Sequence, residues 1–376
     1  MRTRYAAPLL AALFGAAASG PLSAQATALY TRWNAVTGFD FQSYHFQDNR
    51  FGVKTASQWN LPLVVVAPLG RQMSLDLTTH FAHATVSSYN MATSTLSGLT
   101  DTQLRLLYTL GRDRAVASLA LNLPTGKHSV STSEFAVCGA VGSNFLSFPV
   151  ASCGTGFGIT GGLAYATPAG AWNLEFSGSV RYQGSYQPFS DGHLDYAPGL
   201  EGRVRAAADR LLGQRARLLF GLTFSTFSTD QYTGVGIVNG SFTPGPRFIG
   251  DFGYAYSFGA TTVAFTAWDY YRLNSSSPDT TIPVSKENVF NAELRAARQV
   301  SPRFAFEPVV GFRQWSPADY RGGRLFLFGA NARLSFSDRL SAQLSGRFGP
   351  GWAYDPSHGR GDLTATSMTL YLRYQR

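Results

Sequence analysis

The chain of 376 residues has a formal net charge of +9, with 44% hydrophobic, 14% aromatic and only 14% charged residues. Soluble domains usually contain about a quarter charged residues, so this composition is unusual for a soluble enzyme. After the N-terminal segment no apolar run is long enough for a spanning helix, which excludes a helical membrane protein. The basic residues form no run, which argues against a nucleic-acid partner.

The N-terminus has the pattern of a secretory signal peptide. A short basic head precedes an apolar stretch from Tyr5 to Ala18, which is too short to anchor the chain as a spanning helix. Small residues at Ala24 and Ala26 favour cleavage after Ala26, with cleavage after Ala24 as the alternative. We therefore expect residues 1–26 to be removed and residues 27–376 to form one mature domain.

The mature chain alternates between short turns and longer polar segments. Tight turns rich in Gly, Pro, Asp and Ser lie at 70–72, 111–114, 168–170, 212–214, 258–260, 301–303 and 337–339. Longer segments rich in Ser, Thr, Asn, Gly and Pro lie at 47–54, 86–97, 125–155, 185–197, 229–245, 274–286, 316–322 and 351–361. This alternation predicts about sixteen strands, within a range of about 14–16, with both termini on the short-turn side. A short lead, 27–35, precedes the first strand.

The strands themselves alternate apolar and polar residues with period two. In the stretch 217–225, for example, Leu218, Phe220 and Phe224 share one face, and Arg217 lies on the other. The stretches are about ten residues long or more, the length of a tilted membrane strand, whereas strands of soluble proteins usually have about five or six. One stretch, 262–272, is irregular because its alternation turns Asp269 toward lipid, which a bulge or a rim position would resolve.

The predicted fold class is therefore all-β. We expect a transmembrane antiparallel up-and-down β-barrel in the outer membrane, with short periplasmic turns and long extracellular loops. Such a protein lies in outer-membrane lipid and is inserted by the barrel-assembly machinery of a Gram-negative-type envelope.

The face opposite the apolar one is assigned to the lumen and carries charges of both signs. The candidate lumen-lining residues are Arg105, Glu175, Arg181, Glu201, Arg203, Arg205, Arg217, Glu293, Arg295, Arg313, Arg333 and Arg347. Opposite charges two residues apart on one strand, as in Glu201/Arg203 and Glu293/Arg295, share a face and predict arginine–carboxylate networks. These networks either brace the wall or, because arginine is in excess, give a polar pore a mild anion preference.

No pattern of catalytic or metal-binding residues stands out. The sequence lacks GxSxG, HExxH and paired-carboxylate spacings, so we expect no enzymatic activity, no cofactor and no metal. A membrane-embedded hydrolase is the enzymatic alternative, and it would require His80 or His83 within hydrogen-bond reach of a serine and an acidic group.

The longest predicted loop, 125–155, has two unusual features. It contains both cysteines, Cys138 and Cys153, and in an oxidising envelope we expect them to form a disulfide. It is also more apolar than a solvated loop needs, with Phe135, Phe145, Leu146, Phe148 and Val150. We therefore predict that this loop folds inward or packs on the rim of the barrel.

Two short motifs lie on either side of the turn at 111–114. The first, Gly98-Leu99-Thr100-Asp101, opens a strand, and the second, Leu123-Pro124-Thr125-Gly126, ends the next one. Together they resemble the outer-membrane MetA-pathway of phenol degradation family, which is allied with long-chain fatty-acid and hydrocarbon channels. Thr100 stands where that family has a second glycine. The resemblance implies passive uptake of small hydrophobic or aromatic compounds.

The leading functional hypothesis is an outer-membrane channel or transporter for small-molecule solutes. The resemblance favours hydrophobic or aromatic cargo, whereas the charged lumen favours a general diffusion porin with a mild anion preference. A structural surface barrel is a third alternative, for which longer and more charged loops are expected.

Overall fold

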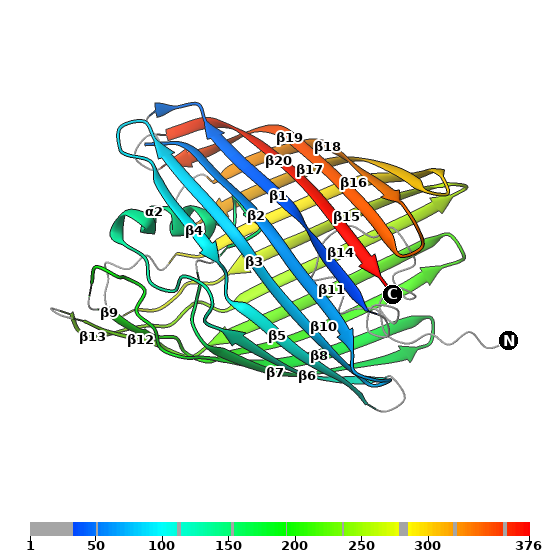
Figure 1. Ribbon diagram of the computed structural model, residues 1–376, viewed down its shortest axis with the longest axis horizontal. Coiled ribbons are helices and arrows are strands. Elements are labelled where there is room, and N and C mark those ends of the chain that lie inside the picture. Colours follow the sequence, from blue (N-terminus) through cyan, green and yellow to red (C-terminus); the bar gives the residue numbers. More distant parts are fainter. Residues whose placement is uncertain are drawn as a thin grey trace.

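The computed structural model describes residues 33–49, 52–110, 114–151, 154–192, 194–234, 237–277, 285–318, 322–355 and 359–376. These residues form a barrel of long tilted strands (Figure 1). The predicted signal peptide, 1–26, most of the predicted lead, 27–35, and Cys153 lie outside the described residues.

One antiparallel sheet forms the wall of the barrel. Its strands are β1 (Asn34–Phe46), β2 (Val53–Pro68), β3 (Met73–Ser88), β4 (Ser94–Leu99), β5 (Thr102–Leu110), β6 (Ala115–Leu123), β7 (Gly158–Ala169), β8 (Trp172–Gln183), β10 (Glu201–Leu212), β11 (Ala216–Phe227), β14 (Arg247–Phe258), β15 (Thr261–Arg272), β16 (Glu287–Ser301), β17 (Phe304–Pro317), β18 (Gly323–Ser335), β19 (Leu340–Asp355) and β20 (Gly359–Gln375). Both β4 and β5 pair with β3, so they are two parts of one wall strand, and the barrel is 16-stranded.

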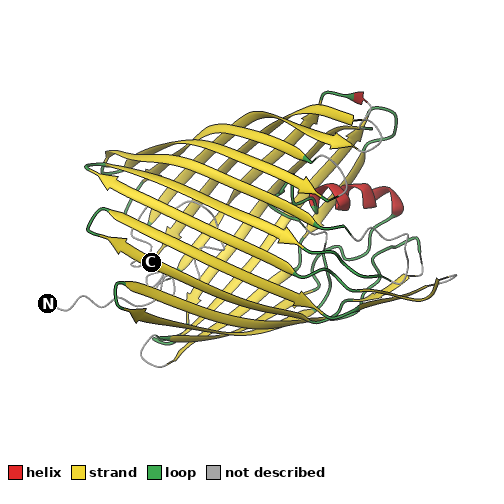
Figure 2. Ribbon diagram, turned by 180° about the vertical axis from the view of Figure 1, so that it is seen from behind, coloured by secondary structure: helices red, strands yellow, loops and turns green. Residues whose placement is uncertain are grey.

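The first and last strands close the barrel. They pair along the whole length of β1, from Asn34 opposite Gln375 to Phe46 opposite Leu363. Closure satisfies the backbone N–H and C=O groups that an open sheet edge would leave unpaired in hydrocarbon. The seven predicted short turns all fall between consecutive strands at one end of the barrel, where β1 begins and β20 ends (Figure 2).

Two of the predicted long loops are wrong in extent. In place of the loop 86–97, β3 continues to Ser88 and β4 starts at Ser94. In place of the loop 351–361, β19 continues to Asp355 and β20 starts at Gly359. The backbone hydrogen bonds of β2–β3 and β19–β20 continue into these segments although the sequence becomes rich in Gly, Ser and Thr. The wall therefore extends further in the extracellular direction at these strands.

The outer surface of the barrel is apolar. Large side chains on it are widely exposed, among them Leu222 at 54%, Phe328 at 53% and Phe348 at 58%. Such a belt is stable only in lipid, and together with the closed antiparallel wall it identifies an integral protein of the outer membrane. Among the described residues, no helix is long and apolar enough to span a membrane.

The irregular strand around Asp269 contains no bulge. The pairing of β15 with both neighbours runs without a register shift, and Asp269 lies opposite Gly250 and Phe290 on the outer face. It lies three residues before the extracellular end of β15, and the Asn288 side-chain amide donates to its carboxylate at 2.7 Å. The rim position therefore accounts for this acidic residue.

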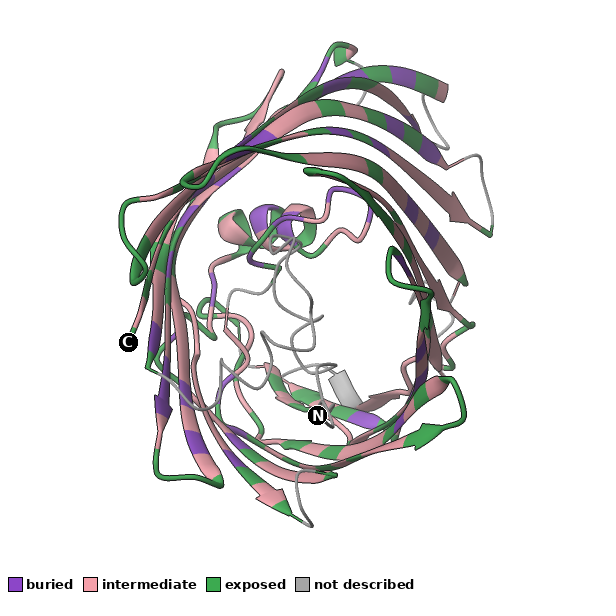
Figure 3. Cartoon of the chain, turned by 90° about the vertical axis from the view of Figure 1, so that its right-hand side faces the viewer, coloured by how far each residue is buried: buried purple, intermediate pink, exposed green. Residues whose placement is uncertain are grey.

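The remaining elements lie at the end of the barrel opposite the short turns. Helix α2 (Thr132–Val141) lies inside the ring of strands (Figure 3). A separate small sheet of β9 (Leu194–Ala197), β12 (Asp230–Gly234) and β13 (Ile237–Phe242) is formed by two of the extracellular loops.

Candidate functional site

The main feature of the lumen is the segment 124–157, here called the lumen insertion. It leaves the wall where β6 ends at Leu123 and rejoins it where β7 begins at Gly158. Its helix α2 contacts β2, β3 and β4. The prediction that loop 125–155 folds inward or packs on the rim is therefore confirmed.

Apolar packing fixes the lumen insertion to the inner wall. The insertion contributes Val130, Val137, Val141, Phe145, Leu146 and Phe148 to one buried cluster. The wall contributes Tyr44, Phe46, Ala56, Ala84, Val86, Leu96, Leu325, Ala353, Leu363 and Ala365. Two ring contacts connect the parts, because Phe148 meets Tyr44 edge-on at 5.4 Å and Phe145 stacks on Trp315 at 5.6 Å. The extracellular half of the inner wall is thus apolar where the insertion covers it.

Polar side chains of the wall satisfy the backbone of the lumen insertion. The Gln58 side chain donates to the Val150 carbonyl at 2.8 Å and accepts the Val150 N–H at 2.9 Å, as a neighbouring strand would. The Leu146 carbonyl accepts hydrogen bonds from the Tyr44 hydroxyl and from Gln42. These contacts matter because an unpaired backbone group costs free energy once it is buried.

Two further contacts tie the insertion to a second part of the wall, β16–β17. The Arg313 guanidinium donates to the Phe145 carbonyl at 2.8 Å. Glu287 accepts hydrogen bonds from Asn144 and from the Trp315 indole N–H, both at 2.9 Å. The segment around Phe145 is therefore held on both sides, by β1–β2 and by β16–β17.

Asp101 joins the two ends of the lumen insertion. One carboxylate oxygen accepts the Gly126 N–H at 3.1 Å, and the other accepts the Thr155 N–H at 2.6 Å. The Asn122 side chain also donates to Asp101, at 3.0 Å. Asp101 lies in the two-residue break between β4 and β5. Because it lies outside both strands, its side chain can reach the insertion. Both motifs that carried the family resemblance therefore meet here, at Asp101 and Gly126.

The two ends of the lumen insertion, here called its limbs, approach each other closely. This close approach explains why glycine is found at two positions. A Cβ on Gly126 would lie 2.7 Å from the Asp101 backbone nitrogen, well inside contact distance. Gly154 has a φ of +122°, and a Cβ there would lie 2.8 Å from the Lys127 carbonyl oxygen. Larger residues at either position would push the limbs apart.

Two carboxylates fasten the start of α2. Glu134 accepts hydrogen bonds from the Lys127 ammonium at 2.6 Å and from the Ser131 N–H at 2.9 Å, and these bonds hold the pKa of Glu134 below its usual range. Asp191, from the loop after β8, accepts the Thr132 N–H at 2.9 Å and the Thr132 hydroxyl at 2.7 Å. These bonds likewise lower the pKa of Asp191.

Most of the arginines proposed for the lumen lie beside a carboxylate. The closest pairs are Arg105–Asp76 and Arg205–Asp251 at 2.6 Å, Arg203–Glu201 at 2.6 Å, and Arg217–Asp209 at 3.0 Å. Looser pairs are Arg295–Glu293 at 3.7 Å, with Arg181–Glu201 and Arg347–Glu293 at 3.9 Å. Glu175 is buried, and Arg313 contacts the lumen insertion. In the described part of the chain, Arg333 has no carboxylate partner.

The pair of Arg205 and Asp251 shows how charged side chains lie along the wall. Arg205 is on β10 and Asp251 on β14, and β11 runs between them. The two side chains meet over Gly221 of β11, where any Cβ would overlap both of them. A two-point contact at 2.6 and 3.0 Å results.

The two histidines singled out for a hydrolase have other partners. The His80 ring lies 3.4 Å from the Asn60 side-chain oxygen, and His83 lies 3.2 Å from the Thr85 hydroxyl. His83 also stacks on Trp59 at 5.5 Å. Within the described ranges, neither histidine is part of a serine–histidine–acid arrangement. The predicted disulfide stays a prediction, because Cys153 lies outside those ranges.

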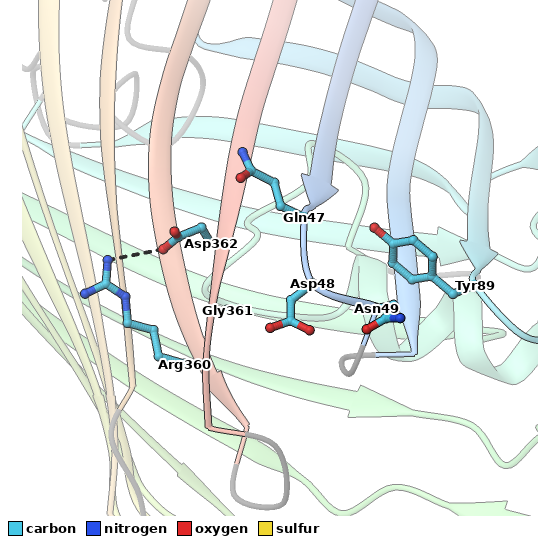
Figure 4. Close-up of a pocket in the computed structure, with 7 residues that line it drawn as sticks. All are labelled: Gln47, Asp48, Asn49, Tyr89, Arg360, Gly361 and Asp362. Carbon is cyan, nitrogen blue, oxygen red and sulfur yellow. Dashed lines mark hydrogen bonds and ion pairs between the residues drawn. The ribbon is translucent and has the colours of Figure 1, made fainter.

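Sequence reasoning missed several residues of the site. Gln42, Tyr44 and Gln58 hold the insertion, and only their inward place in the period-two alternation of β1 and β2 could have indicated them. An open polar pocket of about 700 Å³ at the extracellular rim was also missed (Figure 4). Its lining residues are Gln47, Asp48, Asn49, Tyr89, Arg360, Gly361 and Asp362.

Comparison with known proteins identifies no family for the chain. No family model and no curated protein matches the chain. Solved structures similar to it include a loop-L8 deletion mutant of OmpT, an outer-membrane protein of Vibrio cholerae, with 8% identity over 92% of this chain and 98% of that chain and a TM-score of 0.45. The CymD monoaromatic hydrocarbon channel is 10% identical over 92% of this chain and 88% of that chain, with a TM-score of 0.44. A Pseudomonas aeruginosa FadL homologue is 8% identical over 93% of this chain and 91% of that chain, with a TM-score of 0.45.

These solved structures are distant from the chain, with identities of 8 to 10%. Their TM-scores of 0.44 and 0.45 say nothing about what this chain transports. The resemblance to the phenol-degradation-pathway family likewise remains a prediction.

Proposed function

We propose that this barrel is a passive outer-membrane channel for small hydrophobic or aromatic compounds. The observation that carries the proposal is the apolar contact between the lumen insertion and the inner wall. A wide water-filled pore gains nothing from inward-facing Leu325 and Leu363, which are 0% and 1% exposed. A path for cargo that water solvates poorly needs apolar surface, and this contact places apolar side chains of both the insertion and the wall inside the barrel.

The break between β4 and β5 supports the same proposal. Among the described residues, β4 pairs with β3 and with no other barrel strand, and the next wall strand, β6, ends at Leu123. The limbs of the lumen insertion occupy the position beside β4. A small cavity of about 30 Å³ lies there, lined partly by Leu96, Leu99, Val141 and Val150. We assign the path of hydrophobic cargo to this side of the insertion.

The alternative is a general diffusion pore with a mild anion preference. It is favoured by Arg333 on β18 and Arg373 on β20, which have no carboxylate partner among the described residues, since unpaired arginines attract anions. Arg373 donates to the Asn34 side-chain oxygen at 3.2 Å, which leaves its charge uncompensated. A polar pore would conduct salt, whereas a hydrophobic path would pass cargo with little ionic current.

Uptake by proteoliposomes separates these functions. The purified mature protein would be reconstituted and tested with radiolabelled toluene and with a sugar of comparable size, beside single-channel conductance in a planar bilayer. We expect the barrel to accelerate entry of toluene more than entry of the sugar. Faster entry of the sugar together with steady anion current would favour the diffusion pore. If the protein shows no uptake and no conductance, both functions are excluded.

A further inference from the structure

A row of phenylalanines marks the extracellular edge of the apolar belt on one side of the barrel. Phe290, Phe312 and Phe326 lie on the adjacent strands β16, β17 and β18, and successive rings are 6.5 and 5.2 Å apart. On β18 the outward residues between Phe336 and Phe326 are all apolar. The next outward residue, Arg324, is exposed, so the surface changes from apolar to cationic within two residues.

Other polar and basic side chains continue this boundary. Arg324 lies opposite Trp352 of β19, and Trp352 lies opposite Asp362 of β20. The Arg360 guanidinium lies over the Trp352 ring, 5.2 Å from its centroid. Lys286 lies directly before β16, four residues from Phe290 in the same alternation, and is exposed. We call Lys286, Arg324, Trp352 and Arg360 the outer basic patch.

The charge of the outer basic patch is mostly uncompensated. Asp362 pairs with Arg360 at 3.1 Å and reduces the charge of that residue. No partner is found for Arg324 or Lys286 in the part of the chain that the structure describes. Both cations therefore project outward beyond the phenylalanine row, Arg324 two residues past Phe326 and Lys286 four residues past Phe290.

The opposite side of the barrel is different at the same level. The outward residues near the extracellular ends of β7, β8, β10 and β11 are uncharged and include Ile159, Tyr182, Val204 and Phe224. The outward basic side chains of β16–β20 thus have no counterpart on β7–β11 at this level. A general need for solubility at the rim would not produce this asymmetry.

We propose that the outer basic patch binds the phosphate groups of a phosphorylated glycolipid, lipopolysaccharide, in the outer leaflet. The phosphates of this lipid lie at the hydrocarbon boundary, where the phenylalanine row places Arg324. Arginine forms paired hydrogen bonds with phosphate, and tryptophan is favoured at the membrane interface. The bound lipid would seal the wall on the side opposite β7–β11.

Binding of defined lipids to the folded full-length barrel in detergent micelles tests this proposal. Native mass spectrometry would compare diphosphoryl lipid A with the same lipid after removal of both phosphates. We expect Arg324→Gln to weaken binding of the diphosphoryl form about fivefold, and the triple variant Lys286→Gln/Arg324→Gln/Arg360→Gln on the order of a hundredfold. Arg324→Lys should retain most of the binding, since the charge is kept.

Arg210 provides a matched control. It lies on the outer face at the periplasmic end of β10, with its guanidinium over the Trp172 ring at 5.6 Å. Arg210→Gln should leave binding of lipid A unchanged. Equal binding of the two lipid forms, or an equal loss in Arg210→Gln, would overturn the proposal. Folding of each variant is checked by the heat-dependent gel mobility of the barrel, and a misfolded triple variant leaves the single variants to decide.

Discussion

Asp101 and Gly126 are joined by a hydrogen bond of 3.1 Å from the glycine N–H to a carboxylate oxygen. The two residues are 25 positions apart, and the other oxygen of Asp101 binds Thr155, which is 54 positions away. One side chain in a strand break thus sets where the lumen insertion enters and leaves the wall. The stability of the insertion should therefore depend on this carboxylate.

Replacing Asp101 with alanine should release both limbs of the lumen insertion. The hydrogen bonds to a charged acceptor are lost, and we expect the free energy of local opening to fall by about 2–3 kcal/mol. Limited proteolysis should then cleave within 124–157 much faster, and toluene uptake should change with it. Asp195→Asn is the control, because Asp195 is exposed on β9 of the small extracellular sheet and accepts a bond from Gln187 at 3.1 Å. Unchanged proteolysis in Asp101→Ala would show that the apolar cluster alone holds the insertion.

Gly126→Ala and Gly139→Ala should have opposite effects. At Gly126 the new Cβ would lie 2.7 Å from the Asp101 nitrogen, so the limb must move and the insertion should be destabilised. Gly139, inside α2, has nothing within 4 Å of the added Cβ, and alanine there should stabilise the helix by about 0.5–1 kcal/mol. Amide exchange of 124–151 measures both changes. The same sign in both variants would contradict the steric argument.

Much of the barrel could be predicted from the sequence because lipid imposes a local rule. Outward residues must be apolar and short turns must be tight, so period-two alternation and Gly/Pro clusters locate strands such as 216–227 without knowledge of their partners. The rule fails where the inner wall is covered by protein. Leu325 and Leu363 face inward because the lumen insertion packs on them, and nothing local distinguishes them from lipid-facing leucines.

The charge pairs, too, could be predicted from the sequence only in part. Same-strand pairs such as Arg203 and Glu201 could be read directly from spacing. The pairing of Arg205 with Asp251 could not, since it crosses β11 and depends on register and on the missing side chain of Gly221. The role of Asp101 was visible only as a motif, because its partners lie in segments that fold back from elsewhere.

Acidification should loosen the start of α2. The folded-state pKa values of Glu134 and Asp191 lie below their usual 4.5 and 3.8. Their contribution to stability is therefore fully present above about pH 4.5 and is lost as the pH falls through the lowered pKa values. Amide exchange of 132–141, corrected for its intrinsic pH dependence, should accelerate below that range. The Glu134→Gln variant should show a smaller pH response, and an identical response would exclude Glu134 as a cause.

Replacing Gln58 with leucine should detach the part of the lumen insertion around Val150 from the wall while leaving the barrel closed. The leucine is similar in volume but cannot pair with the Val150 N–H and C=O, which Gln58 holds at 2.9 and 2.8 Å. Leaving these buried groups unpaired costs about 1–3 kcal/mol each. We expect faster amide exchange at Val150 with little change in the thermal unfolding of the wall. Protection at Val150 equal to that of the parent protein would contradict this role.

Removing the carboxylate of Asp251 should increase the preference of the lumen for anions. Asp251→Asn leaves the Arg205 charge without its two-point partner, and it should destabilise the barrel by about 1–3 kcal/mol because the pair is largely buried. The reversal potential across a bilayer with a salt gradient measures the preference. Asp362→Asn is the control, since its pair with Arg360 is exposed on the outer surface and should leave selectivity unchanged. If Asp251→Asn conducts ions with the selectivity of the parent protein, the Arg205 side chain does not border the ion path, and the charge pairs serve to brace the wall.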